Sequence, residues 1–218
     1  MPTSTVEDYL KQIYLLQHSG KLAPMGKLAA AVGVTPGTAT SMVKTLSDAN
    51  LADYEPRAGV RLTPAGTKLA LQVLRRHRLV ELFLVQTLGL DWSEVHDEAE
   101  ELEHAISDKV LEKIDQLLGH PDTDPHGDPI PPATGRPRKQ KLTPLNECAS
   151  DTAAQVARVT DQAVEFLQFV DKHGLTPGAR FTVVSHTPTA DAITVQPNDS
   201  DPVTLGSAAA KKIMVRVV

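Results

Sequence analysis

The sequence is poor in several features, and each shortage excludes a class of protein. Its 218 residues include one cysteine, Cys148, which rules out an intramolecular disulfide framework and fits a reducing compartment. No apolar run approaches the roughly 18 residues of a membrane-spanning helix. The N-terminus, MPTSTVEDYLKQ, lacks the cationic flank and apolar core of a signal peptide. These absences predict a cytoplasmic protein with no membrane partner.

The chain also lacks an excess of positive charge, and its net charge of −5 by itself argues against a nucleic-acid binder. That average hides an asymmetry along the chain. Residues 1–74 hold seven Lys or Arg against five Asp or Glu, whereas residues 75–120 hold five against eleven. The acidity is therefore concentrated in a central segment, where bound cations could neutralise it.

The central segment contains the sequence VHDEAEELEH, residues 95–104. On a helix, two imidazoles and two carboxylates of this run share one face: His96, Glu100, Glu103 and His104. His77 and Glu81 form a similar pair, four residues apart, on the preceding predicted helix. If the two helices pack as a hairpin, these side chains converge into a set of metal ligands. A solvated acidic helix is the alternative that the pattern leaves open.

The first 63 residues have the pattern of a winged helix-turn-helix. We expect a first helix capped by Ser4 or Thr5 and ending near Gly20, and short helices over 25–32 and 36–49. The third helix carries small polar side chains and a lysine on one stripe, which suits contact with a DNA groove: Thr35, Thr38, Ser41 and Lys44. A capped surface helix is the alternative. Residues 51–63 predict a hairpin wing with Arg57 and Arg61 available for phosphate.

The rest of the chain is predicted to contain long helices, then an irregular linker, and then a strand-rich domain. Long helices are expected from Pro64 to about Leu88 and from Trp92 to Leu118, followed by the Pro-rich segment HPDTDPHGDPIPP. The cationic stretch ATGRPRKQK is interpreted as a linker, for which solubility and DNA contact are both open roles. From about Leu142, short alternating strands and one amphipathic helix predict a small SH3-like β-barrel.

Six motifs match in order and spacing those of a known family: EDYLKQIYLL, VTPGTATSMVKTL, RLTPAGTKLA, RRHRLVELFL, VHDEAEELEHAISDKV and PHGDPIP. In these motifs the chain resembles the diphtheria toxin repressor family of metal-dependent regulators, and within it the manganese transport regulators. The resemblance implies a transcriptional repressor, not an enzyme. Such a repressor binds promoter DNA as a homodimer when loaded with Mn(II), or alternatively Fe(II), and controls metal-uptake genes.

The resemblance also implies two metal sites. One would use Asp8, Glu100, Glu103 and His104, with His77. The second would use Glu81, Asp124, His126 and Asp161, with His96 as a further candidate. The iron-regulating branch usually has Met in place of Asp8 and Cys in place of Glu100, and some manganese-type relatives have Cys in place of Asp124. Oxygen in place of sulfur favours Mn(II).

The expected fold is therefore mainly α with small β parts, in three domains and a linker. These are a winged helix-turn-helix over 1–72, a helical dimerisation and metal-binding domain over 73–132, a linker over 133–147, and an SH3-like (FeoA-like) domain over 148–218. Two other functions stay open from the residues alone. One is a carboxylate-bridged metalloenzyme built on paired helices. The other is a metal-independent DNA-binding protein.

Overall fold

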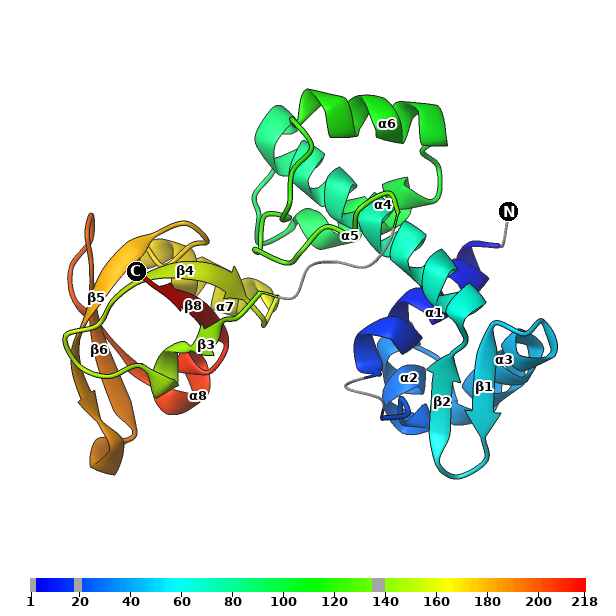
Figure 1. The fold of residues 1–218 in the computed structure, drawn as a ribbon, viewed down its shortest axis with the longest axis horizontal. Helices are drawn as coiled ribbons and strands as arrows, with labels where there is room; N and C mark the ends of the chain where they lie inside the picture. Colours follow the sequence, from blue (N-terminus) through cyan, green and yellow to red (C-terminus); the bar gives the residue numbers. More distant parts are fainter. Residues whose placement is uncertain (1–2, 18–20, 135–139) are drawn as a thin grey trace. The chain divides into compact units, whose positions relative to one another are not determined.

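The computed structural model of the chain describes residues 3–17, 21–134 and 140–218. It divides into two compact units: Met1–His77 with Pro131–Arg136, and Arg78–Ile130 with Pro137–Val218. Figure 1 shows the helical first half of the chain and the strand-rich second half. Among the described residues, no helix combines the length and apolar character needed to cross a membrane. Five residues of the predicted linker, 135–139, lie outside the described residues.

The first unit contains the predicted winged helix-turn-helix. Its elements are α1 (Ser4–Leu16), α2 (Met25–Val32), α3 (Pro36–Asp48), and the antiparallel pair β1 (Ala52–Glu55) and β2 (Gly59–Leu62). Thr35 caps α3 by accepting a hydrogen bond from the Thr38 backbone, and Pro36 occupies the first helical position. The core beneath these helices includes Leu10, Ile13 and Val43.

The start of α1 differs from expectation. The helix begins at Ser4, with Thr3 at the N-cap, and the Thr3 side chain makes no capping hydrogen bond. It ends at Leu16, before the predicted stop near Gly20, and residues 18–20 are not described. Neither Ser4 nor Thr5 is therefore the cap, because both lie inside the first turn of the helix.

Of the two long helices predicted in the central segment, one is confirmed and the other is wrong. The helix α4 (Pro64–Leu88) runs as predicted, and Gly89 follows it with a φ of 73°. The segment expected as one helix from Trp92 to Leu118 forms two, α5 (Val95–Glu103) and α6 (Asp108–Leu117). The break has a local cause, because Ser107 accepts a hydrogen bond from the Val110 backbone and so caps a new helix.

The C-terminal part forms a six-stranded sheet in the order β3-β8-β4-β5-β6-β7, with antiparallel neighbours. The elements are β3 (Thr143–Pro144), η1 (Leu145–Glu147), β4 (Ala153–Val159), α7 (Val164–Lys172), β5 (Arg180–Thr187), η2 (Pro188–Ala190), β6 (Ala192–Pro197), β7 (Val203–Gly206), α8 (Ser207–Ala210) and β8 (Ile213–Val217). Alternate residues of the strands, such as Val156, Val183 and Val195, fill its core. Trp92, from the loop before α5, also packs against this core.

Candidate metal centre

Three buried side chains of the second unit come together although they are far apart in the sequence. Glu81 lies on α4, and Asp124 and His126 lie in the Pro-rich loop after α6. Each offers one ligand atom, and these atoms lie within 4.8 Å of one another. All three side chains are nearly inaccessible to solvent, with exposed fractions of 1 to 4%. The group has the size and the donor types of a metal site.

The hydrogen bonding of His126 defines which ring nitrogen could bind a metal. Its Nε2 lies 2.8 Å from the backbone carbonyl oxygen of Trp92. A carbonyl only accepts hydrogen bonds, so Nε2 is the donor, and in the neutral imidazole Nδ1 then carries the lone pair. Nδ1 is buried without a hydrogen-bond partner among the described residues. An orienting bond on one ring nitrogen and a lone pair on the other is the usual arrangement of a ligating histidine.

Asp124 is a carboxylate in an environment that disfavours its charge. Its Oδ1 accepts hydrogen bonds from the backbone N–H groups of His126 and Asp128, both at 2.9 Å. Its Oδ2 forms an ion pair with Arg78 Nε at 3.3 Å and, among the residues that the structure describes, has no hydrogen-bond partner. Burial raises the pKa of Asp124 well above its ordinary value, and the charges of Asp128 and Glu81 raise it further, whereas Arg78 lowers it. This excess of buried negative charge favours a cation at the group.

The predicted stripe on α5 also forms. Nδ1 of His96 lies 3.2 Å from Glu81 Oε1, and its Nε2 lies 3.5 Å from Glu100 Oε1. Ligand atoms of Glu100, Glu103 and His104 lie within 4.8 Å of one another, and Glu103 is fully buried. His104 is the C-cap residue of α5 with helical dihedral angles, so the helix break just after it leaves the stripe intact.

Asp8 and His77 belong to the first unit. Asp8 is half-buried on α1, two residues before the core residue Leu10. His77 is buried on α4, one turn before Glu81.

The remaining predicted ligand, Asp161, has other partners. Its Oδ2 lies 2.6 Å from Nζ of Lys212, and its Oδ1 accepts a hydrogen bond from the Ala163 backbone. These two hydrogen bonds, the one from Lys212 foremost, hold the pKa of Asp161 below its ordinary value. In the described part of the chain, Asp161 is not brought into any group of potential metal ligands.

The donor chemistry of the assembled groups fits a hard or borderline divalent ion. The groups supply carboxylate oxygens and imidazole nitrogens, and Cys148 is buried in the barrel core away from them. Such a donor set suits Mn(II) or Fe(II), since thiolates are what draw softer ions. The buried lone pair of His126 Nδ1 and the crowded carboxylates thus agree with a bound divalent metal.

The predicted DNA-reading residues are exposed in the first unit. Thr35, Thr38, Ser41 and Lys44 all face solvent on α3, opposite the core residues Ala39, Val43 and Leu46. In the wing, Arg57 has a φ of 68° at the exposed turn between β1 and β2. Arg61 forms ion pairs with Asp53 and Glu55 across the hairpin. Arg57 is therefore the more available of the two arginines for a phosphate.

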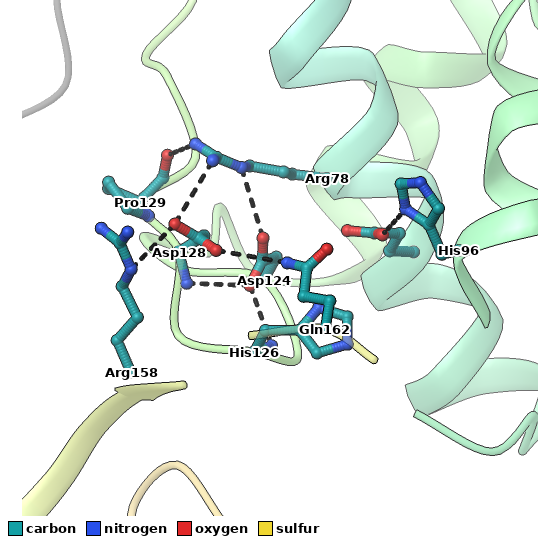
Figure 2. A network of polar contacts seen from close by, with 9 residues as sticks. Arg78, His96, Asp124, His126, Asp128, Pro129, Arg158 and Gln162 are labelled. Atoms are coloured by element: carbon teal, nitrogen blue, oxygen red, sulfur yellow. Dashed lines mark hydrogen bonds and ion pairs between the residues drawn. The ribbon is translucent and has the colours of Figure 1, made fainter. Parts of the chain in front are cut away.

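Four residues that surround the buried group were not predicted from the sequence: Arg78, Asp128, Arg158 and Gln162. Figure 2 shows them around Asp124 and His126. Asp128 lies within the PHGDPIP motif, which was the one available signal. The others come from α4, β4 and the segment after β4, and no local pattern relates them.

Comparison with known proteins identifies the family. Three family descriptions match successive parts of the chain: "Iron dependent repressor, N-terminal DNA binding domain" over residues 1–60, "Iron dependent repressor, metal binding and dimerisation domain" over 63–132, and "FeoA domain" over 143–217. The iron-dependent repressor IdeR of Mycobacterium tuberculosis is 31% identical over 192 residues, which cover 82% of this chain and 83% of the relative. The chain belongs to the diphtheria toxin repressor family. It is a metal-dependent transcriptional repressor, and the metalloenzyme alternative is thereby excluded.

Other relatives within the diphtheria toxin repressor family include manganese regulators. The HTH-type transcriptional regulator MntR of Lysinibacillus sphaericus is 36% identical over 118 residues, covering 54% of this chain and 84% of the relative. A solved structure described as a manganese-dependent transcriptional repressor in complex with manganese has 39% identity and a TM-score of 0.88, covering 98% of this chain and all of that chain. The metal bound by this family is divalent, and relatives of both the manganese and the iron type are similar to this chain.

Proposed function

We propose that this protein is a manganese-activated repressor that binds operator DNA as a homodimer and controls metal-uptake genes. The observation that carries the metal assignment is the donor set, which consists of carboxylates and imidazoles without a thiolate. Affinity for an unselective N/O/S site rises from Mn(II) towards the later metals, so a manganese sensor depends on hard ligands and coordination number. The manganese-dependent repressor of similar fold supports the same choice.

The proposal places two centres in each chain. Glu100, Glu103 and His104 form the first, with Asp8 and His77 as the ligands contributed by α1 and α4. Glu81, Asp124 and His126 form the second, with His96 beside Glu81. Asp161 is hydrogen-bonded to Lys212 and, in the described part of the chain, does not join this group, so the proposal does not count it among the ligands of the second centre.

The chain's own residues explain how metal would control DNA binding. Without metal, Glu100 and Glu103 lie together on α5 and repel each other. A bound divalent ion supplies the positive charge that makes it favourable for further carboxylates to join them. Asp8 belongs to α1, so its recruitment restricts the DNA-reading unit relative to the central helices. If that restriction spaces two recognition helices about one DNA turn apart, about 34 Å, the DNA-competent state gains population.

A dimer is supported by exposed apolar side chains on the central helices. Leu88, Leu102, Val110 and Leu117 are each 38 to 66% exposed on or beside α4, α5 and α6. Contact with a second copy of the same helices would remove these side chains from water. The matching family description of residues 63–132 as a dimerisation domain supports the same interface.

The test is a fluorescence-anisotropy titration of an operator fragment with and without Mn(II), comparing wild type with Glu103→Gln. Glu103 is buried in the proposed first centre, and Glu101→Gln on the exposed side of α5 is the matched control. We expect Mn(II) to tighten binding in wild type and Glu101→Gln, and to have no effect in Glu103→Gln. Equal operator affinity in chelator and in excess Mn(II) for the wild type would reject metal activation.

A further inference from the structure

The hairpin wing of the first unit has a free edge along β2, because β1 pairs with only one side of that strand. On the other side, Ala23 and Val60 exchange two backbone hydrogen bonds of 2.7 and 3.0 Å, and both residues are fully buried. Backbone groups two residues apart in a strand point to the same edge, so the Leu62 amide also faces this side. The Ala23–Val60 bridge is a single residue pair, and the Leu62 amide therefore needs another acceptor.

A side chain of α1 supplies that acceptor. The Leu62 backbone N–H donates a hydrogen bond to Oε1 of Gln17 at 2.9 Å, although the two residues are 45 positions apart in the sequence. Gln17 is the C-cap residue of α1, and its own backbone N–H donates to the Ile13 carbonyl oxygen at 2.9 Å. The contact is partly buried, so water competes for it less than at an open surface. The end of α1 is thus fastened directly to β2.

The fastened hairpin carries the arginine that is available for a phosphate. Arg57 lies exposed at the turn between β1 and β2, whereas Arg61 is engaged in ion pairs within the hairpin. A two-stranded hairpin is at best marginally stable by itself in water. The place of Arg57 therefore depends on what holds β2 from outside the hairpin, and Ala23 and Gln17 do so.

We propose that Gln17 is a positioning residue for DNA binding, because it fastens the wing to α1 and so holds Arg57 where that side chain meets a DNA phosphate. This inference rests on the proposed function as an operator-binding protein. The same helix carries Asp8, a proposed metal ligand. The hydrogen bond from Leu62 to Gln17 therefore makes the wing follow a displacement of α1.

The first experiment compares Gln17→Met with Gln12→Met, a half-buried glutamine on the same helix, in the full-length protein. Methionine keeps the length of the side chain but is only a weak acceptor. Hydrogen exchange of the Leu62 amide should be roughly tenfold faster in Gln17→Met and unchanged in Gln12→Met. Exchange of the Ala39 amide, which donates to the Thr35 carbonyl in α3, shows that the fold of the unit is kept.

The second experiment measures whether Arg57 depends on Gln17. Phosphate contacts carry no sequence information, so the probe is a mixed-sequence DNA duplex in excess Mn(II), followed by fluorescence anisotropy. We expect Arg57→Gln to weaken binding by roughly fivefold in the wild-type and Gln12→Met backgrounds, and by less than about twofold in Gln17→Met. It should also lower the slope of log affinity against log salt by about one in the first two backgrounds only. Simple loss of stability would not produce this dependence on Arg57.

The outcomes separate this inference from the proposed function. If the Leu62 amide exchanges alike in the two methionine variants, or if Arg57→Gln has the same effect in both backgrounds, the positioning role of Gln17 is wrong and DNA binding stands. If Arg57→Gln has no effect in the wild type, the wing does not contact DNA, and the positioning role is rejected with that contact. The comparison of Glu103→Gln with Glu101→Gln tests the metal dependence of the proposed function independently of both results.

Discussion

Nε2 of His126 donates a hydrogen bond to the backbone carbonyl oxygen of Trp92 at 2.8 Å, so the imidazole is held by the main chain and not by another titrating side chain. The bond fixes both the tautomer and the plane of the ring. Nδ1, buried and without a hydrogen-bond partner among the described residues, is then a preorganised donor atom. Because the ring is already oriented, binding a metal there loses little side-chain entropy.

We therefore predict that His126→Gln lowers the stoichiometry by one Mn(II) per chain, or lowers the affinity for that ion by at least about tenfold. The matched control is His120→Gln, since His120 is an exposed histidine of the same unit that pairs with Asp115. Isothermal titration calorimetry measures both variants, and thermal unfolding of the metal-free proteins checks that the fold is kept. Identical stoichiometry and affinity in the two variants would remove His126 from the metal site.

The Asp161–Lys212 pair gives a prediction about pH. The pKa of Asp161 is lowered in the folded protein, chiefly by the Lys212 hydrogen bond. A lowered pKa means that the pair stabilises the fold fully above the unfolded-state pKa of about 3.9, and that this contribution is lost as the pH falls below that value. For a partly exposed pair we expect less than about 1 kcal/mol.

Asp161→Asn tests this, because an amide oxygen still accepts from the Ala163 backbone while the charge is lost. We expect the free energy of unfolding to be slightly lower than in wild type at pH 7, and the difference to shrink as the pH falls below the unfolded-state value of about 3.9. We also expect the Mn(II) stoichiometry to stay unchanged. A lower stoichiometry in Asp161→Asn would return this residue to the ligand set.

The polar face of α3 predicts a separation of DNA binding from metal binding. Thr38→Ala and Ser41→Ala remove exposed hydroxyl groups from the proposed recognition stripe, while Thr40→Ala changes a half-buried hydroxyl that bonds within the helix to the Pro36 carbonyl. We expect the first two variants to weaken operator binding, each by about 1 kcal/mol or more, with Mn(II) titrations unchanged. Thr40→Ala should bind DNA as wild type does.

Lys44, on the same stripe, gives a related prediction about how DNA affinity depends on salt. Replacing it with Gln should reduce the slope of log affinity against log salt by about one, because one phosphate contact is lost. If Thr38→Ala, Ser41→Ala and Lys44→Gln all retain wild-type operator affinity, DNA recognition lies elsewhere, with Arg57 in the wing as the next candidate.

Features with a local cause could be predicted from the sequence. Pro36 after Thr35 predicts the start of α3, Gly89 predicts the end of α4, and the i, i+4 spacing predicts the shared face of His96 and Glu100. The break before α6 was missed although its cap is local. Its signal is a single serine, Ser107, in a stretch from Trp92 to Leu118 that contains no glycine or proline.

Features with a long-range cause could not be predicted. The ion pair between Asp128 and Arg158 depends on where β4 lies after the sheet has formed. No local sequence pattern around either residue indicates the other as its partner. The hydrogen bond between Lys212 and Asp161 likewise joins the start of β8 to the segment after β4. Periodicity reports the face of an element on which a residue lies, but not which distant element covers that face.

Metal selectivity is the last prediction, and it concerns Asp8 and Glu100. Both are oxygen ligands at the positions where the resemblance places Met and Cys in iron-regulating relatives. Since affinity at an unselective site rises from Mn(II) through Fe(II) to the later metals, manganese cannot be chosen by strength of binding alone. Manganese is selected if activation of DNA binding requires an ion with a complete set of hard ligands, because only such an ion draws Asp8 into the site.

The double variant Asp8→Met with Glu100→Cys should therefore shift activation of DNA binding away from Mn(II) and towards Fe(II) and Co(II). The thioether and thiolate favour fewer, softer contacts, which these ions accept more readily than Mn(II) does. Glu101→Cys, an exposed neighbour on α5, controls for the added thiol. Anaerobic operator titrations with each metal give the rank order of activators. If that order is the same in wild type, the control and the double variant, Asp8 and Glu100 do not set selectivity, and the ligands of the second centre are the place to look for it.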